Sequence, residues 1–167
     1  MGLMFIENPV SASTLARHLN SGISPKGDNH YVVFLREPVA RFWSGVKKDY
    51  PDDTYQEKIE SALQNLGHGH LCNQVDSVFG KEVDEIIVMD DSFQDSVASL
   101  LERHDVTWVV NFSVDYNYAK NASRDMSQDA EALSYITNTP VIFDKIEKYY
   151  ADDFVWWEDF NSKVKGA

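Results

Sequence analysis

The stretch from Tyr31 to Val46 constrains the fold more than any other part of this chain. It opens with an apolar run, Tyr31 to Leu35, whose β-branched and aromatic residues predict a buried strand. Glu37-Pro38 ends that strand, because proline fixes its own backbone and disfavours a helical conformation in the preceding residue. Pro38 then suits the first turn of a helix, and the acid before it suits the positive end of the helix dipole. A strand that runs directly into a helix predicts an α/β arrangement.

The polar residues of this stretch indicate an anion site. Arg36 stands at the carboxyl end of the expected strand, where open α/β sheets bind ligands. Arg41 and Ser44 are three residues apart in the expected helix, so they share a face. Two guanidinium groups and a hydroxyl near a helix start can receive a phosphate, although both arginines could instead pair with some of the many acids. An apolar stripe lies roughly opposite and consists of Val39, Phe42, Trp43 and Val46.

Composition narrows the partners that such a chain can bind. Its 167 residues suffice for one domain with its own core, and we expect a single domain over residues 1–167. A net charge of −12 disfavours nucleic acid and anionic membranes, because both require a positive surface. The single cysteine, Cys72, excludes an internal disulfide and predicts a reducing, cytoplasmic setting. No apolar run reaches the length of a membrane span.

A second candidate anion site precedes this stretch. Gly2 to Ile6 predicts the first strand of a parallel sheet, and a helix follows with Ser11 or Ser13 as its cap. A strand, a loop of small residues and a helix start can form a cradle of backbone N–H groups; the alternative is simply a capped helix. The residues of this loop are Pro9, Ser11, Ala12, Ser13 and Thr14.

Further helices and strands follow along the chain. Thr54 to Leu66 predicts a largely exposed helix, and Glu85 to Met89 predicts a strand whose following helix is capped within Asp90-Asp91-Ser92. Val106 to Phe112 is apolar enough for a strand or a buried segment, and Thr139-Pro140 starts a late helix. Strands that alternate with helices predict an α/β fold with a central parallel sheet.

Histidine and cysteine occur together between Gly67 and Gln74. His68, His70 and Cys72 stand at alternate positions, which raises the question of a zinc site. Their spacing matches no common structural zinc site and a fourth ligand is missing, so we expect no metal here. A loop with solvated histidines is the alternative.

Residues Leu35 to Gly45, which read LREPVARFWSG, resemble the 3′-phosphate-binding motif of sulfotransferases, R-[DE]-P-x-x-R-[FY]-x-S-[GA]. These enzymes use 3′-phosphoadenosine 5′-phosphosulfate (PAPS). The resemblance implies that Arg36 and Ser44 hold the 3′-phosphate of the nucleotide, with Arg41 as a further contact.

The loop from Pro9 to Thr14 is similar to the 5′-phosphosulfate loop of the same family, P-K-x-G-[ST]-[ST]. Ala12 replaces the glycine of that pattern, and Val10 stands where the family has its lysine. In the family that lysine contacts the bridging oxygen and steadies the sulfuryl group, and valine can do neither.

Two later segments extend the resemblance. His70 to Gln74 is similar to the H-x-x-x-Q of carbohydrate sulfotransferases, which implies that His70 is the general base, with His68 as the second choice. Tyr150 to Phe154 resembles the common family ending Y-x-x-D-[FY]. Between them, Lys120 and Arg124 are implied as additional nucleotide contacts.

Taken in order along the chain, these motifs imply a P-loop-like, three-layer α/β fold of the sulfotransferase type. The implied activity is transfer of a sulfuryl group from the co-substrate PAPS to a hydroxyl acceptor, in particular a carbohydrate, without a metal. The alternative is a non-catalytic module of this fold that binds nucleotide or glycan, which Val10 supports. A different P-loop nucleotide transferase fits less well, because no G-K-[ST] lies in the first loop. The sequence identifies neither the acceptor nor the oligomeric state.

Overall fold

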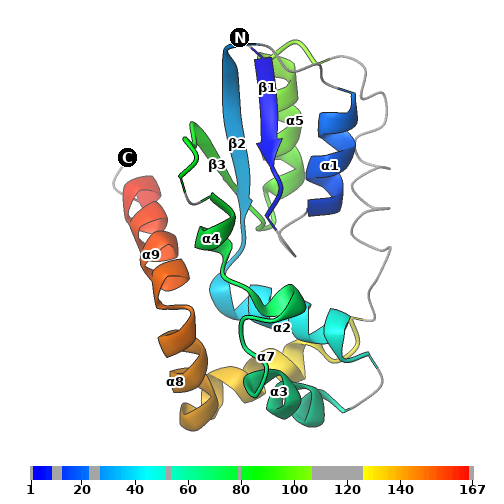
Figure 1. The fold of residues 1–167 in the computed structure, drawn as a ribbon, viewed down its shortest axis with the longest axis vertical. Coiled ribbons are helices and arrows are strands. Elements are labelled where there is room, and N and C mark those ends of the chain that lie inside the picture. Colours follow the sequence, from blue (N-terminus) through cyan, green and yellow to red (C-terminus); the bar gives the residue numbers. More distant parts are fainter. Residues whose placement is uncertain are drawn as a thin grey trace. The chain divides into compact units, whose positions relative to one another are not determined.

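The computed structural model describes residues 2–8, 13–22, 27–51, 54–78, 80–106 and 126–165. The chain forms two compact units, each assembled from two separate stretches of sequence (Figure 1). Unit 1 comprises Met1–Arg36 and Ser77–Ser123, and unit 2 comprises Glu37–Asp76 and Arg124–Ala167.

Unit 1 contains a three-stranded parallel sheet in the order β1-β2-β3. Its central strand, β2, is apolar on both faces, and Val32 to Leu35 expose at most 1% of their surface. Two helices cover one face of the sheet (Figure 1). The elements are β1 (Gly2–Ile6), α1 (Ser13–Ser21), β2 (Asn29–Leu35), β3 (Glu85–Val88) and α5 (Phe93–Arg103).

Alternate side chains of the strands build the core of unit 1, because successive residues of a strand point to opposite faces. Phe34 lies at the centre of this core. Its ring centroid is 5.3 Å from that of Phe5 on β1 and 5.0 Å from that of Phe93 on α5. Strand parity therefore decides which residues of β2 and β3 face α5.

Unit 2 is helical and is organised around α2, whose Phe42, Trp43 and Val46 lie in its core. Trp43 Nε1 and Lys47 Nζ both donate to Asp129 Oδ1, at 2.8 and 2.7 Å, and so tie α2 to α7. The elements are α2 (Pro38–Asp49), α3 (Tyr55–Leu63), the 3₁₀-helix η1 (Gly69–Leu71), α4 (Gln74–Val78, which continues into unit 1), α7 (Asp129–Asn138), α8 (Pro140–Tyr149) and α9 (Ala151–Lys165).

Most of the predicted elements are confirmed. The strands over residues 2–6, 31–35 and 85–88 are present, as are helices that begin at Pro38 and Pro140, so the α/β class and the parallel sheet are confirmed. The helix expected over 54–66 ends earlier, at Leu63, and is less exposed than predicted, because Ile59 and Ala62 are buried. Of the predicted segment Val106 to Phe112, only Val106 is among the described residues. Among the described residues, no helix combines the length and the apolar character that crossing a bilayer requires.

Asp153 gives the stability of unit 2 a pH dependence of known sign. Burial raises the pKa of this carboxyl above its ordinary value of 3.8, although its hydrogen bonds to Gln74 N and Val75 N and the charge of Arg41 oppose the shift. The folded protein therefore keeps a proton on Asp153 to a higher pH than the unfolded chain does. Ionisation of this group costs stability as the pH rises from 3.8 through the folded pKa.

We predict that the stability of the wild type relative to Asp153→Asn falls over that pH range. Urea unfolding at a series of pH values measures this difference. The variant is also less stable at every pH, by about 1–3 kcal/mol, because its amide NH₂ faces a backbone N–H. Asp152→Asn, at the exposed neighbouring position, is the matched control and should follow the wild type. Parallel curves for the wild type and Asp153→Asn would contradict the prediction.

Candidate functional site

One side of α2 holds the loop that carries His70. Arg41, Gly45 and Asp49 follow one another at intervals of four residues, so they form a single ridge along the helix. η1 and its neighbours pack against this ridge. Each of the three residues contacts the loop differently, and together they fix both the backbone and the ring of His70.

Asp49 binds the backbone N–H of His70, and Arg41 binds its backbone carbonyl. Asp49 Oδ2 accepts from His70 N at 2.9 Å, and Asp49 Oδ1 lies 2.5 Å from His70 Nδ1. Arg41 Nη1 donates to the carbonyl of His70 at 3.2 Å. A carboxylate can only accept, so the contact with Asp49 selects the tautomer that carries its proton on Nδ1, and in that tautomer Nε2 is a proton acceptor. The His70 side chain is 37% exposed, so it can be reached from solvent.

Gly45 permits the close approach of this loop. A Cβ at position 45 would lie 2.5 Å from the carbonyl oxygen of His70 and 3.2 Å from Leu71 Cδ2. Gly69 serves the loop in a different way, since its φ of +55° lies in the left-handed region, where other residues are strained. A Cβ there would also meet Asp49 Oδ2 at 2.7 Å. The two glycines therefore let the loop reach both the helix and the carboxylate.

Arg41 is fully buried, and its described contacts are with this loop. Besides the bond to His70, Nη2 lies 3.5 Å from Cys72 Sγ, and Nε has no hydrogen-bond partner in the described structure. Ser44 is also buried, with 6% of its surface exposed. The face of α2 that carries Arg41 and Ser44 is thus packed rather than solvated. The predicted roles of Arg41 and Ser44 toward a phosphate stay predictions.

The C-terminal helices bind the continuation of the same loop, from Leu71 to Val75. Tyr150 Oη donates to the carbonyl of Leu71 at 2.5 Å, and Asp153 accepts from the backbone N–H groups of Gln74 and Val75 at 2.8 and 2.9 Å. Burial raises the pKa of Tyr150 well above its ordinary value of 10.0, which keeps its hydroxyl protonated as a donor. The tyrosine and aspartate of the sequence Y-x-x-D-F therefore both clamp the segment that carries H-x-x-x-Q.

The start of α2 differs from the predicted open anion site. Glu37 caps the helix, with its two carboxylate oxygens accepting from Val39 N at 3.0 Å and Ala40 N at 2.7 Å. These N–H groups are occupied by a negative group and cannot also receive a phosphate. An anion near this helix start must therefore be bound by side chains. Arg36, half-buried after the end of β2, is the nearest candidate in sequence.

The remaining predicted site residues lie partly outside the described structure. Pro9, Ser11 and Ala12 are outside the described residues, as are Lys120 and Arg124. Helix α1 begins at Ser13, so Ser13 and Thr14 are its first two residues, and the prediction that Ser11 or Ser13 caps this helix stays a prediction. Arg36 belongs to unit 1, whereas Arg41, Ser44 and His70 belong to unit 2. Of the predicted residues, the structure brings Arg41 and His70 into direct contact.

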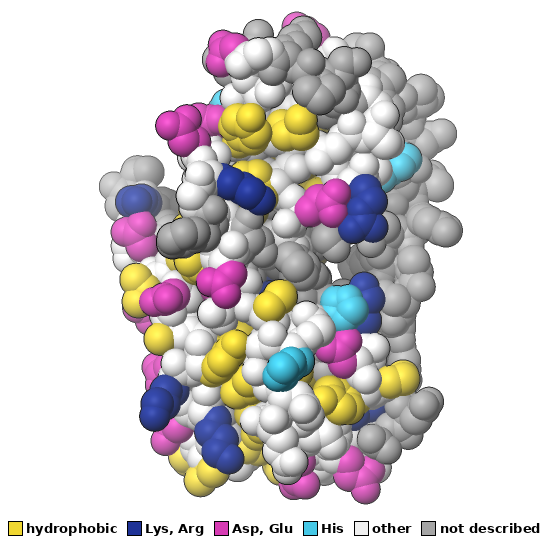
Figure 2. All heavy atoms as spheres, viewed as in Figure 1, with side chains coloured by type: hydrophobic (Ala, Val, Ile, Leu, Met, Phe, Trp, Pro, Cys, Tyr) yellow, Lys and Arg dark blue, Asp and Glu magenta, His cyan; other side chains and the backbone are white. Residues whose placement is uncertain are grey.

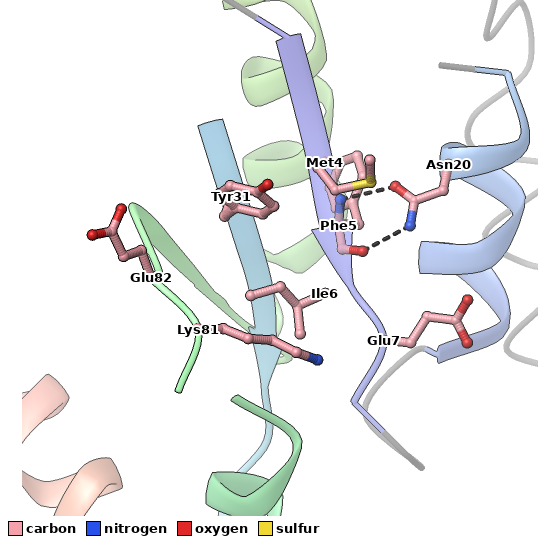
Figure 3. Close-up of a pocket in the computed structure, with 8 residues that line it drawn as sticks. All are labelled: Met4, Phe5, Ile6, Glu7, Asn20, Tyr31, Lys81 and Glu82. Carbon is pink, nitrogen blue, oxygen red and sulfur yellow. Dashed lines mark hydrogen bonds between the residues drawn. The ribbon is translucent and has the colours of Figure 1, made fainter. Parts of the chain in front are cut away.

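Unit 1 contains a pocket of about 590 Å³ beside the carboxyl end of β1 (Figure 3). Its apolar part comes from Met4, Ile6 and Tyr31 on β1 and β2, and Lys81 extends toward Ile6 in this view. Asn20 accepts from Phe5 N at 2.8 Å and donates to Phe5 O at 2.7 Å, and so pairs the backbone of this residue as a further strand would. Glu7 and Glu82 give the pocket an acidic part.

The chain was compared with protein-family models, curated proteins and solved structures, and no significant match was found. Charge on the surface gives little further guidance. Figure 2 shows basic side chains scattered among acidic ones on the visible face, and the net charge of the chain is −12. The sequence motifs and the contacts around His70 are therefore the features that bear on function.

Sequence reasoning missed Asp49, which fixes the orientation of His70. The signal was present in part, because Arg41, Gly45 and Asp49 share the helical interval of four residues. Nothing in the sequence paired that ridge with a loop that lies 21 positions further along the chain.

Gly45→Ala tests the packing of the loop on α2. The added Cβ would overlap the carbonyl of His70, so the loop must move away from the helix. We predict a loss of about 1–3 kcal/mol in the free energy of unfolding, as for overpacking in other tight sites. Thermal and urea unfolding measure it. Ala62→Gly, at a buried position of α3, is a control for a one-methyl change in the same unit and should leave the NMR signals of the His70 ring in place. If Gly45→Ala also left those signals unchanged, the close approach would be unimportant.

Proposed function

We propose that this protein is a sulfotransferase that moves a sulfuryl group from PAPS to a hydroxyl group of a carbohydrate acceptor. The observation that carries the proposal is the surroundings of His70. This residue is the implied general base, and it is half-exposed, paired through Nδ1 with a carboxylate and held through its backbone by Arg41. A histidine held in this way has the tautomer that a general base requires.

Three motif segments that resemble sulfotransferases support the proposal through one set of contacts. Arg41 and Gly45 come from the arginine–serine motif, His70 from H-x-x-x-Q, and Tyr150 from the terminal motif. Residues of the first and the last motif therefore both contact the segment from His70 to Leu71, which belongs to the second. Residues that a motif resemblance groups by function thus also depend on one another physically. The finer fold prediction, a three-layer sulfotransferase type, is part of this proposal, and the parallel α/β sheet is compatible with it.

The chemistry of the proposed reaction assigns a task to each group. His70 Nε2 takes the proton of the acceptor hydroxyl while the acceptor oxygen forms a bond to sulfur. The bond between sulfur and the bridging oxygen of PAPS breaks, and adenosine 3′,5′-bisphosphate leaves with the electron pair. Asp49 stabilises the imidazolium that forms, and Arg36 and Ser44 bind the 3′-phosphate. In-line positioning would supply much of the rate, as it does in phosphoryl transfer.

The rival function is a non-catalytic module that binds nucleotide or glycan. Val10 favours it, because this position lacks the lysine that would steady the sulfuryl group. The two functions differ in turnover and not in nucleotide affinity. They therefore need separate experiments on binding and on transfer.

Arg36→Ala tests the nucleotide site. We predict that it weakens binding of adenosine 3′,5′-bisphosphate about 10- to 150-fold, since a hydrogen bond to a charged group contributes about 1.5–3 kcal/mol. Isothermal titration calorimetry measures the affinity. Arg103→Ala removes the same charge from the other end of the sheet in the same unit and should bind like the wild type. Unchanged affinity in Arg36→Ala, or no binding by the wild type, would contradict the nucleotide assignment.

His70→Ala and Asp49→Asn test the transfer step. General base catalysis contributes about 10²–10⁴-fold, so His70→Ala should lower kcat by that factor. Asp49→Asn should lower it by up to about 10⁴-fold, because the ring loses the carboxylate that holds its tautomer and orientation. Release of adenosine 3′,5′-bisphosphate from PAPS with a panel of glycans is the measurement. The matched control is Glu60→Gln, which removes an exposed carboxylate from α3. Tight nucleotide binding without turnover in the wild type would favour the non-catalytic module.

A further inference from the structure

A cluster of three metal-ligating side chains lies in unit 1. His30, Glu85 and His104 each direct one donor atom toward the others, and these three atoms lie within 4.8 Å of one another. All three residues are half-buried. Among the described residues, this is the group whose geometry suits a metal ion.

The topology of unit 1 explains why these residues meet. His30 shares strand parity with Val32 and Phe34, so it points to the face that α5 covers. Glu85 shares parity with Ile87 in the same way. α5 follows β3 through a short connection and returns along the sheet, so its carboxyl end reaches the amino ends of the strands. His104 caps that end of α5 and lies 4.8 Å, ring centroid to ring centroid, from His30.

The carboxylate of Glu85 is already oriented for a ligand role. Arg103 Nη2 donates to Oε1 at 2.8 Å, while Oε2 lies 3.0 Å from His30 Nε2. Arg103 thus fixes one oxygen, and the other lies within hydrogen-bond distance of His30. Partners of this kind, which orient a ligand without touching the metal, are a regular part of metal sites.

We propose that His30, Glu85 and His104 bind a zinc ion at the amino-terminal edge of the sheet. Two imidazoles and one carboxylate form a ligand set that suits zinc, and three protein ligands leave the fourth tetrahedral position to water. With ligand bonds of about 2.0–2.1 Å, donor atoms around a tetrahedral ion stand about 3.3 Å apart. His30 Nε2 and Glu85 Oε2 are already 3.0 Å apart. Zinc binding therefore needs an inward rotation of the third side chain, His104.

Zinc titration of the metal-stripped full chain tests the site, with calorimetry as the readout. We expect one zinc ion to bind to the wild type. His30→Ala and His104→Ala should each bind at least tenfold more weakly, because even the loss of an outer contact weakens metal affinity by about 10–100-fold. His18→Ala, an exposed histidine on α1 in the same unit, is the matched control and should bind like the wild type.

Two further measurements keep the test decisive. Circular dichroism establishes whether each variant is folded. If a histidine variant is unfolded, Glu85→Gln is used in its place. Cobalt(II) should give the visible absorption of a tetrahedral site in the wild type and lose it in the cluster variants. Equal zinc binding by the wild type and His104→Ala would overturn the proposal, as would no binding by the wild type below millimolar zinc. Neither outcome bears on nucleotide binding, which Arg36→Ala tests separately.

Discussion

The close packing of the η1 loop on α2 is the constraint on which the proposed catalytic unit depends. It requires glycine at position 45, because any side chain there would overlap the carbonyl of His70. The approach in turn lets Arg41 reach that carbonyl and lets Asp49 reach the ring. A fully buried guanidinium is costly unless it is hydrogen-bonded, so the loop and Arg41 stabilise each other. Loss of the loop would remove the hydrogen bond from Arg41 to the carbonyl of His70.

This acidic protein could bind an anion through the backbone N–H groups of a helix start or through cationic side chains. Helix starts attract anions through their backbone N–H groups, but at the start of α2 Glu37 occupies two of these groups. A phosphate there would meet a carboxylate instead of free donors. Recognition of a nucleotide must then rely on side-chain cations, of which Arg36 follows directly on β2. Substitution of Arg36 is therefore more informative than substitution of any residue of the helix start.

The parts of the structure that sequence could predict are those set by local physics. The apolar run before Glu37-Pro38 and the helix after it follow from residue type and spacing alone. The burial of Arg41 did not follow, because a helical wheel treats a polar residue as solvent-facing and contains no information on a loop that packs over it. Asp49–His70 and His30–Glu85 are contacts between residues 21 and 55 positions apart, and only the folded chain brings such pairs together. The phosphosulfate-like loop remains a prediction from sequence.

The central strand of unit 1 makes the two proposed ligand sites independent of each other. His30 lies near the start of β2, and Arg36 follows its last residue, so about six strand residues, or roughly 20 Å, separate them. The residues between them, Val32 to Leu35, are buried and packed in the sheet, which makes this part of the strand a rigid spacer. A zinc ion at the amino end would therefore stabilise the sheet without entering the chemistry at the carboxyl end. On this argument zinc should raise the unfolding temperature of the protein and leave its nucleotide affinity unchanged.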